Sequence, residues 1–209
     1  LEISRRNEDT EFKVPLQRLS NVTAELQEGV MKTRMQPIGN AWQKLPRIVR
    51  DLSGELGKQI ELEMHGADTE LDRQVLERML PPFEHILRNA VSHGIELPAE
   101  REARGKPATG RITLALRREG AEVIVQVSDD GAGMNLKAIR DKGLALGLIR
   151  AGQVLSDDDV MQLVLEPGFS TAGKVTQHSG RGVGMDVVAD SVKKLGGALF
   201  IESKPGAGA

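Results

Sequence analysis

The sequence predicts an α+β protein, a two-layer α/β sandwich in which helices cover one face of a sheet and long helices precede it. Two observations support this fold class. Apolar residues recur at steps of three and four through the first 57 positions, which is the period of a helix. Farther along, short runs of alternating apolar residues, typical of strands, are separated by helical stretches.

The N-terminal part is predicted to contain two helices. The first runs from Pro15 to about Met35, where Pro37 and Gly39 interrupt it. The second has Pro46 as an expected kink and Gly57 as its end. Their apolar stripes are Leu16, Leu19, Val22, Leu26 and Val30, and then Trp42, Leu45, Val49, Leu52 and Leu56. Periodicity alone leaves open whether these stripes pack on their own domain or form a bundle between chains.

The remaining elements follow from the same patterns. Alternation predicts strands at residues 60–64, 112–116, 122–128 and 199–201, and helices containing residues 72–93 and 185–195 should cover one face of the sheet. Pro81 and Pro82 predict a helix break, with a new start near Pro82. The run from Ser156 to Asp159 resembles a capping box and predicts a small helix over 157–165.

The segment HILRNAVSHG, residues 85–94, carries the first candidate ligands. Its apolar residues form a buried helical stripe, so His85, Asn89 and His93 share the other face, and Gly94 ends the helix. A carboxamide oxygen suits a magnesium ion that shares its other positions with water and phosphates, so Asn89 is the predicted metal ligand. The plainer alternative is the solvated face of an amphipathic helix.

The segment DDGAG, residues 129–133, follows an alternating β-branched run. A strand thus delivers Asp129 to a loop in which Gly131 and Gly133 allow a ligand to approach the backbone. A carboxylate there can accept a hydrogen bond from an exocyclic amine such as adenine N6, a bond that contributes about 1.5 to 3 kcal/mol. The alternative is an ordinary Asp-Gly turn.

The segment GRGVGMDVV, residues 180–188, places Gly180, Gly182 and Gly184 directly before an apolar helical stretch. Exposed backbone N–H groups and a helix N-terminus then face one place, which favours phosphate. The chain lacks the third glycine of a dinucleotide fingerprint, and no Gly-Lys pair is followed by Ser or Thr, so Rossmann and P-loop sites are excluded.

Composition excludes other classes. A net charge of −2 with 2% aromatic residues gives no basic stacking surface for nucleic acid. No apolar run is long enough for membrane insertion, and the absence of cysteine excludes disulfides and thiolate chemistry. The first residues lack an apolar signal region, which favours a cytoplasmic location.

Taken in order, the three segments resemble the N, G1 and G2 boxes of the GHKL ATPase superfamily, and their sequences are most similar to those of the CheA family of chemotaxis histidine kinases. The resemblance covers most of residues 15–209. It extends through VMKTRMQPI, LPRIVRDLSGELGK, GIELPAEREARGKPATG and EPGFSTAGKVTQHSGRGVGMDVV.

The resemblance implies a domain organisation. Residues 1–57 would form a helical dimerisation segment, a partial hairpin, with a connector. Residues 58–209 would form the ATP-binding kinase domain of GHKL type, with a mixed sheet and a truncated C-terminal strand. A flexible lid would occupy about residues 143–180.

It also implies roles at matching positions. Asn89 and His85 would hold or orient Mg²⁺, Arg88 and His93 would lie near the phosphates of ATP, and Asp129 would read adenine. The other implied catalytic, pocket and lid residues are Lys142, Gly131, Gly133, Met134, Ser170, Thr171, Gly180, Arg181, Gly182, Val183, Gly184 and Met185. CheA sequences commonly carry Asp where this chain has Ser92, a change expected to tune the site.

Residue 85 bears on the reaction. Many GHKL hydrolases place Glu here to activate water, so His85 argues against vigorous hydrolysis. Phosphoryl transfer needs mainly positioning and charge neutralisation, which favours a kinase that delivers the γ-phosphate to a histidine. None of the four histidines lies in a phosphoacceptor context, and His65 and His178 are expected at a solvated strand end and in the lid. The acceptor should therefore lie on a separate phosphotransfer domain.

The implied partners are a second copy, forming a homodimer through the N-terminal helices, a histidine phosphotransfer domain and a downstream response regulator. A CheW-like adaptor and a chemoreceptor would bind through regions outside this sequence. The output would be chemotaxis or surface motility. Two alternatives stay open: a GHKL clamp that hydrolyses ATP to drive conformational change, and an ATP-binding scaffold without catalysis.

Overall fold

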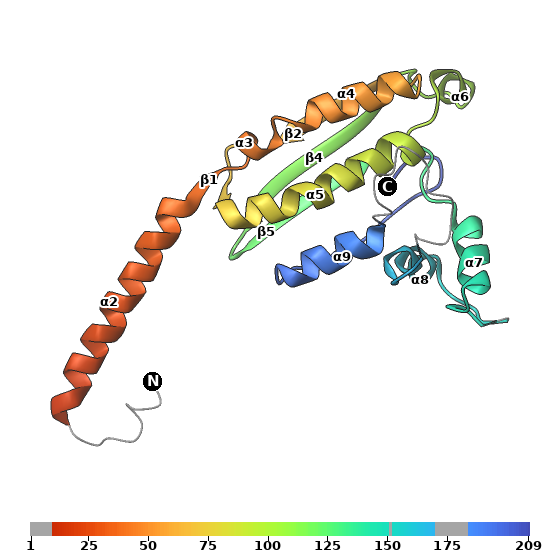
Figure 1. Cartoon of the computed structure of the whole chain (residues 1–209). Coiled ribbons are helices and arrows are strands. Elements are labelled where there is room, and N and C mark those ends of the chain that lie inside the picture. The colour runs from red at the N-terminus through yellow and green to blue at the C-terminus, as the bar shows by residue number, and fades with distance from the viewer. Residues whose placement is uncertain (1–9, 151, 170–183) are drawn as a thin grey trace.

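The computed structural model describes residues 10–150, 152–169 and 184–209. A long helix projects from a body in which a sheet and several helices lie together (Figure 1). The helices are α2 (Thr10–Arg34), α3 (Gly39–Trp42), α4 (Leu45–Glu55), α5 (Arg73–Asn89), α6 (Pro98–Ala103), α7 (Leu136–Ala145), α8 (Asp157–Gln162) and α9 (Met185–Lys194), with a π-helical turn η1 (Ala90–Gly94) and a 3₁₀ turn η2 (Leu163–Leu165). The strands are β1 (Met35–Pro37), β2 (Ile60–His65), β3 (Glu70–Asp72), β4 (Gly110–Glu119) and β5 (Glu122–Asp129).

The main sheet is mixed, as expected. Its order is β2-β4-β5, with β2 parallel to β4 and β4 antiparallel to β5. Leu62 lies opposite Ile112, and Leu114 lies opposite Val127, so one face of the sheet is aliphatic. A separate antiparallel ribbon joins β1 to β3. Three of the four strands predicted from alternation are thereby confirmed.

The fourth predicted strand, at residues 199–201, is wrong. This stretch forms no ladder, and Phe200 is 81% exposed. An alternating run becomes a strand only where a neighbouring strand takes up its backbone N–H and C=O groups, and no strand in the described ranges does so here. The alternation of apolar residues was therefore insufficient.

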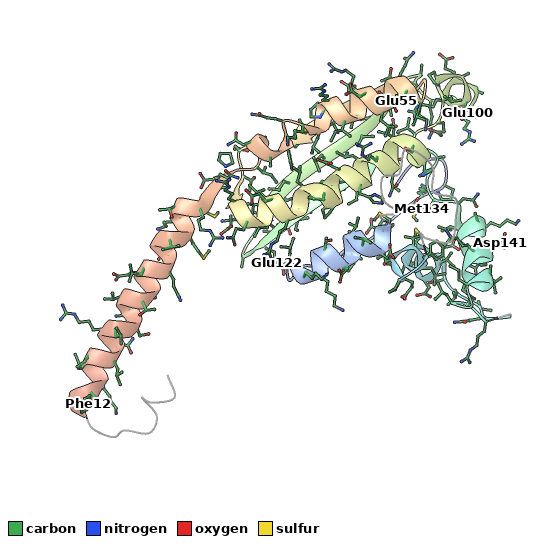
Figure 2. All side chains as sticks on the ribbon, in the orientation of Figure 1. Phe12, Glu55, Glu100, Glu122, Met134 and Asp141 are labelled. Carbon is green, nitrogen blue, oxygen red and sulfur yellow. The ribbon has the colours of Figure 1, made fainter. Side chains whose placement is uncertain are left out.

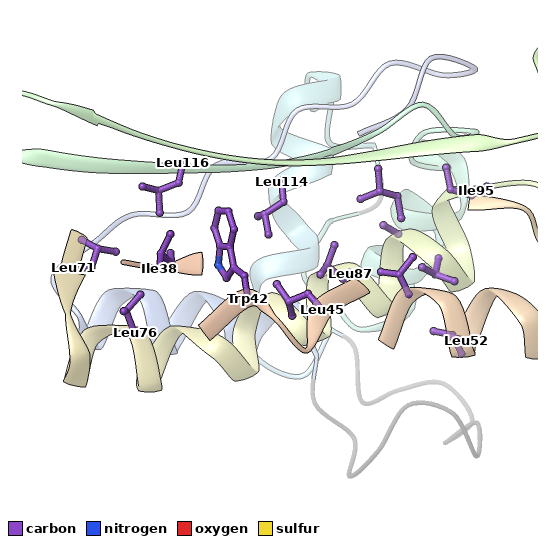
Figure 3. Packing of buried hydrophobic residues seen from close by; sticks show 14 residues of the cluster. Ile38, Trp42, Leu45, Leu52, Leu71, Leu76, Leu87, Ile95, Leu114 and Leu116 are labelled. Carbon is purple, nitrogen blue, oxygen red and sulfur yellow. The ribbon is translucent and has the colours of Figure 1, made fainter. Parts of the chain in front are cut away.

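The core lies between the sheet and the helices on one of its faces (Figure 3). Helices α3, α4 and α5 and turn η1 supply one side of it, and α9 lies beside α5. The buried residues of this core are Ile38, Trp42, Leu45, Val49, Leu52, Leu71, Leu76, Leu87, Ala90, Val91, Ile95, Ile112, Leu114 and Leu116. The second N-terminal stripe thus packs on its own domain. The division between residues 57 and 58 stays a prediction, and α3 and α4 share their core with β2 and β4.

Helix α2 is confirmed, and its apolar stripe is exposed along its length (Figure 2). Phe12, Leu19 and Leu26 are each more than half exposed. The described part of the chain therefore leaves this stripe uncovered. No helix within the described residues combines the length and the apolar character needed to cross a bilayer.

Two expectations about proline are wrong. Helix α5 is continuous through Pro81 and Pro82, because Pro82 and the adjacent Phe83 are buried and their packing holds the helix across the missing N–H groups. Pro46 does not kink a helix. It lies in the first turn of α4, where its absent N–H would have had no intrahelical partner.

A second, smaller core joins α7, α8 and η2 and contains Ile139, Val160, Val164 and Phe169. The predicted helix over 157–165 is confirmed as α8 followed by η2. Its capping box is reciprocal, because Ser156 Oγ accepts from the Asp159 backbone N–H at 3.1 Å and Asp159 Oδ2 accepts from the Ser156 N–H at 3.3 Å.

Candidate nucleotide site

One groove of about 2270 Å³ lies among α5, η1, β5, α7 and α9. It brings together residues from all three segments that the sequence singled out, although they are separated by up to a hundred positions along the chain. The predicted site residues that line it are His85, Asn89, His93, Asp129, Gly133, Met134, Lys142, Gly184 and Met185.

The end of α5 widens into a π-helical turn. Ile95 N–H donates to Ala90 O, five residues earlier, at 2.9 Å. Lys58 closes this turn, because its Nζ donates to Val91 O at 2.7 Å and to Ser92 O at 2.9 Å. Burial lowers the pKa of this lysine. The ammonium group thus satisfies two carbonyls that the helix end leaves without partners, a role the sequence did not reveal.

His85 and Asn89 contact each other, with 3.0 Å between His85 Nε2 and Asn89 Nδ2. Burial lowers the pKa of His85, and the nearby charge of Asp186 opposes that effect. A neutral imidazole can accept a hydrogen bond at Nε2, which matches donation from the carboxamide nitrogen. Asn89 Oδ1 then remains for a ligand, since no group among the described residues donates to it.

Asp129 ends β5 and turns its carboxylate back on its own loop. Oδ1 accepts from the Gly131 N–H at 2.9 Å. Burial raises the pKa of this carboxyl, with the neighbouring charge of Asp130 acting in the same direction. A Cβ on Gly94, the last residue of η1, would lie 2.9 Å from Asp129 Oδ2, so this glycine is needed for close packing of the two segments.

The two glycines of the loop, Gly131 and Gly133, are required for different reasons. A Cβ on Gly131 would lie 2.1 Å from Gly94 O, where the N–H of Ala132 donates to the same carbonyl at 2.9 Å. Gly133 has φ +73°, and a Cβ there would lie 2.6 Å from Lys204 O. The first glycine lets two backbones touch, and the second permits a left-handed turn against a third segment.

That third segment, residues 203–209, closes the other side of the loop. Ser203 Oγ accepts from Met134 N–H, and Ala132 O accepts from Gly206 N–H, each at 2.8 Å. Asp129 N–H donates to Ala209 O at 2.8 Å. Nothing in the spacing of these residues indicated the contact, because the three bonds join positions 69, 74 and 80 residues apart.

The side of the groove formed by α7 is held by a contact between a cation and an aromatic ring. Lys142 Nζ lies 4.9 Å from the centroid of the Phe169 ring, and Phe169 is buried. Gly168 N–H donates to Asp186 Oδ2 at 3.2 Å, which ties the end of this segment to the first turn of α9. Phe169 belongs to the GFST run, residues 168–171, which the family resemblance assigns to a nucleotide-ordered lid segment, although no role was predicted for its ring. Asp186 was not singled out from the sequence as a site residue.

Two predicted site residues within the described ranges, Arg88 and Gly131, do not line the groove. Arg88 is half-buried on α5. His65 lies at the exposed end of β2, as expected. The predicted site residues that lie outside the described ranges are Ser170, Thr171, Gly180, Arg181, Gly182 and Val183, and His178 lies there too.

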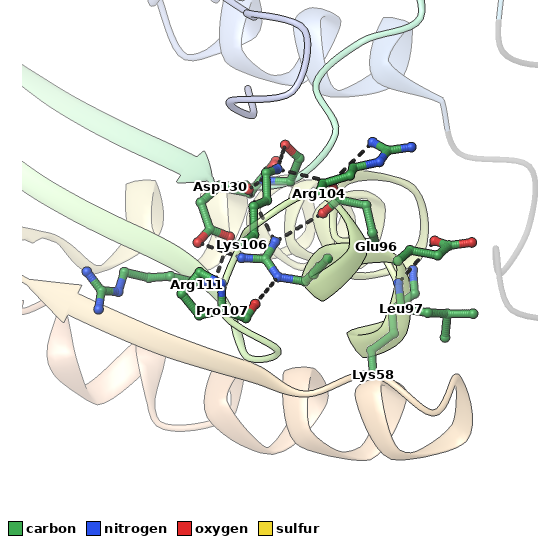
Figure 4. A network of polar contacts seen from close by, with 12 residues as sticks. Lys58, Glu96, Leu97, Arg104, Lys106, Pro107, Arg111 and Asp130 are labelled. Atoms are coloured by element: carbon green, nitrogen blue, oxygen red, sulfur yellow. Dashed lines mark hydrogen bonds and ion pairs between the residues drawn. The ribbon is translucent and has the colours of Figure 1, made fainter.

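A network of charged side chains contacts the loop that follows Asp129, and none of its members lines the groove (Figure 4). It comprises Glu96, Arg101, Lys106 and Asp130. Glu96, Arg101 and Lys106 lie in residues 94–110, a stretch that resembles the CheA family. The sequence predicted no role for them, because a run of charged residues is typical of a solvated surface.

Comparison with known proteins agrees with this geometry. The chain is 46% identical over 192 residues to the sensor histidine kinase CheAY of Helicobacter pylori, covering 91% of this chain and 24% of that protein. It is 45% identical over 184 residues to the chemotaxis protein CheA of Salmonella typhimurium, covering 88% of this chain and 27% of that protein. The chain therefore spans about a quarter of the length of these relatives.

A solved structure, the histidine kinase domain of the blue-light activated kinase EL346 of Erythrobacter litoralis, matches 82% of this chain and 58% of that chain with a TM-score of 0.44 and 16% identity. Residues 80–209, which carry Asn89, Asp129 and α9, match the model of one protein family. The chain belongs to the histidine kinase-, DNA gyrase B- and HSP90-like ATPases, and over most of its length it is similar to CheA proteins.

Proposed function

We propose that this chain is the ATP-binding catalytic core of a CheA-like two-component protein-histidine kinase in the cytoplasm. It would transfer the γ-phosphate of ATP to a histidine on a separate phosphotransfer domain. The observation that carries this proposal is the convergence of Asn89, His85 and Asp129 on one groove. The names of the similar proteins, which are sensor histidine kinases and chemotaxis proteins, support the same reading.

Asp129 is the proposed base-reading residue. Its Oδ1 is engaged by Gly131 N–H, which leaves Oδ2 to accept from the exocyclic amine of adenine. Gly131 and Gly133 keep side chains out of the loop, so that base and ribose can approach the backbone. The apolar side chain of Met134 lines the same part of the groove.

Asn89 is the proposed ligand of Mg²⁺. Its Oδ1 is a hard, neutral oxygen that is left over once Nδ2 has paired with His85. Among the described residues no cluster of three or more His, Cys, Asp or Glu could hold a metal ion. This fits an ion that takes few protein ligands and completes its shell with phosphates and water. When bound, Mg²⁺ would neutralise charge on the phosphates.

His85 is better suited to orient Asn89 than to bind the ion itself. Its Nε2 faces the carboxamide, and imidazole nitrogen is a softer ligand than magnesium prefers. The same contact supports transfer over hydrolysis, because the lone pair that would take a proton from water is already used. Lys142, His93 and the predicted lid residues are proposed to lie near the phosphates. For Arg88 the same place is proposed from the family resemblance alone, because this residue does not line the groove.

The proposed partners follow from the same family. A homodimer through α2 is supported by the exposed stripe of that helix, which would be buried against a second copy. The histidine phosphotransfer domain, the response regulator, and an adaptor and chemoreceptor bound through other regions remain proposals.

The test is transfer of labelled phosphate. The purified chain is incubated with Mg²⁺ and γ-labelled ATP, with and without the phosphotransfer domain of a CheA relative as acceptor. We expect little release of inorganic phosphate by the chain alone, and acid-labile label on the acceptor histidine when it is present. Steady hydrolysis without acceptor would favour the clamp. ATP binding with no transfer to the acceptor would favour the inactive scaffold.

A further inference from the structure

Four charged side chains form a buried network beside the Asp129 loop, and none of them lines the groove (Figure 4). The Arg101 side chain is 0% exposed and that of Glu96 is 5% exposed, while Lys106 is 18% and Asp130 is 45% exposed. They comprise two cations and two anions, and the more exposed Arg104 also pairs with Glu96. Burial of charged side chains costs free energy unless their polar atoms are paired. A network of this kind is therefore weak evidence for stability alone, and a functional role is sought for it.

The network converges on the backbone of the loop. Asp130 O accepts from Arg101 Nη1 at 3.2 Å and from Lys106 Nζ at 2.9 Å. Gly131 O accepts from the same Nζ at 2.7 Å. Arg101 also pairs its Nη2 with Asp130 Oδ2 at 3.0 Å. Lys106 therefore holds the main-chain oxygens of both residues that follow Asp129, and Arg101 holds that of Asp130.

Glu96 fixes the two cations. Its Oε2 accepts from Arg101 Nη1 and its Oε1 from Lys106 Nζ, each at 3.0 Å. Arg101 Nε donates to Pro107 O at 2.8 Å, which fixes the guanidinium at its other end. One carboxylate thus aligns two donors that would otherwise be free to rotate, and the fork geometry of the guanidinium sets their direction.

The hydrogen bonds continue to the base-reading group. Arg101 and Lys106 hold the carbonyl of Asp130, which belongs to the same peptide group as the Gly131 N–H, and that N–H donates to Asp129 Oδ1 at 2.9 Å. A shift of the peptide group between Asp130 and Gly131 would rotate the Asp129 carboxylate away from the position set by this bond. Charged hydrogen bonds depend on geometry, so the recognition of a purine amine should depend on the network.

We propose that the four network residues, Glu96, Arg101, Lys106 and Asp130, are positioning residues. They hold the Asp129 carboxylate in the orientation that accepts a hydrogen bond from the 6-amino group of a purine, and they thereby set the selectivity of the site for adenine. The inference rests on the proposed function of Asp129. It predicts that loosening the network lowers discrimination at the 6-position and leaves the phosphate end of the site unchanged.

The test uses Lys106→Met, which keeps the apolar stem and removes the ammonium group that holds both loop carbonyls. The matched control is Arg104→Met, because Arg104 Nη1 pairs with the same Glu96 at 3.5 Å but has no bond to the loop. For each protein the Kd is measured with ATP and with purine riboside triphosphate, which lacks the 6-amino group.

We expect the wild-type chain and Arg104→Met to prefer ATP about tenfold or more, the discrimination that one charged hydrogen bond supplies. In Lys106→Met the preference should fall to about twofold, while the Kd for purine riboside triphosphate stays within about threefold of wild type. Equal weakening of both ligands, with the preference intact, would overturn the inference.

The failures are distinguishable. If the wild-type chain binds the two nucleotides equally, the proposed recognition of adenine by Asp129 is refuted, and so is the inference that rests on it. If wild type discriminates and Lys106→Met does so equally, only the inference fails. Should Lys106→Met not fold, Asp130→Asn is used, because that side chain is partly exposed and keeps its volume. Unchanged discrimination in Asp130→Asn would overturn the inference as well.

Discussion

Replacing Asp129 by Asn changes one charge at the centre of the proposed site. Because Oδ1 accepts from Gly131 N–H at 2.9 Å, an Asn oxygen can keep that bond, which places its Nδ2 where Oδ2 now lies. The adenine amine would then meet a donor in place of an anionic acceptor. Loss of one charge-assisted hydrogen bond costs about 1.5 to 3 kcal/mol, so the affinity for ATP should fall about 10- to 150-fold.

The same substitution should stabilise the fold. Burial raises the pKa of Asp129, so the folded state favours the neutral carboxyl and its ionisation at neutral pH costs stability. Asn is neutral at every pH, and the variant should have the higher free energy of unfolding at pH 7. As the pH falls below the raised pKa of Asp129, the difference between the two proteins should shrink. It should vanish below the ordinary pKa of an Asp carboxyl, where the group is protonated in the folded and unfolded states alike.

Two measurements check this pair of effects. Calorimetric titration gives the Kd for ATP, and urea unfolding at several pH values gives the free energy of unfolding. Binding of inorganic triphosphate serves as the control, since it senses the phosphate end alone and should be unchanged. An Asp129→Asn protein that binds ATP as tightly as wild type, or that is less stable at pH 7, would refute the reasoning.

Three further outcomes are expected. Asn89→Ala and Asn89→Asp should each abolish phosphotransfer to an added acceptor histidine by misplacing Mg²⁺, and normal transfer in both would exclude Asn89 as the ligand. Lys58→Met should lower the free energy of unfolding by about 1 to 3 kcal/mol because two carbonyls of η1 lose their donor, whereas the exposed Lys44→Met should change it little in urea melts. Amide exchange across residues 143–165 should slow when ATP is added, and equal rates in both states would count against a lid.

Elements defined by local periodicity were predictable. The spacing of apolar residues predicted α2, β2, β4 and β5, and the pairing of Ser156 with Asp159 predicted α8. Each of these signals is contained within one element, since a helix cap or an alternating run needs few distant residues to take shape. The three glycine- and amide-containing boxes were also visible, because each is a short continuous motif and the three occur in the order of the family's boxes.

Elements that depend on distant partners were not predictable. The Pro81-Pro82 pair reads as a break, and only burial of Pro82 and Phe83 in the core keeps α5 continuous. Residues 199–201 alternate like a strand but have no ladder in the described structure. In both cases tertiary structure overrode local propensity: core packing keeps the helix continuous in the first, and no described strand pairs with the segment in the second.

The order of residues established the fold class, the three segments of the site and the types of side chain each contributes, because helical spacing and glycine placement are properties of neighbours in the chain. Tertiary structure decided the contacts among those segments. It paired Asn89 with His85, placed Gly94 and Gly131 against each other, and buried Arg101 with Glu96 behind the loop. A hydrogen bond between distant segments forms only when the donor–acceptor distance is right to within a few tenths of an ångström, and the packing of the core sets that distance.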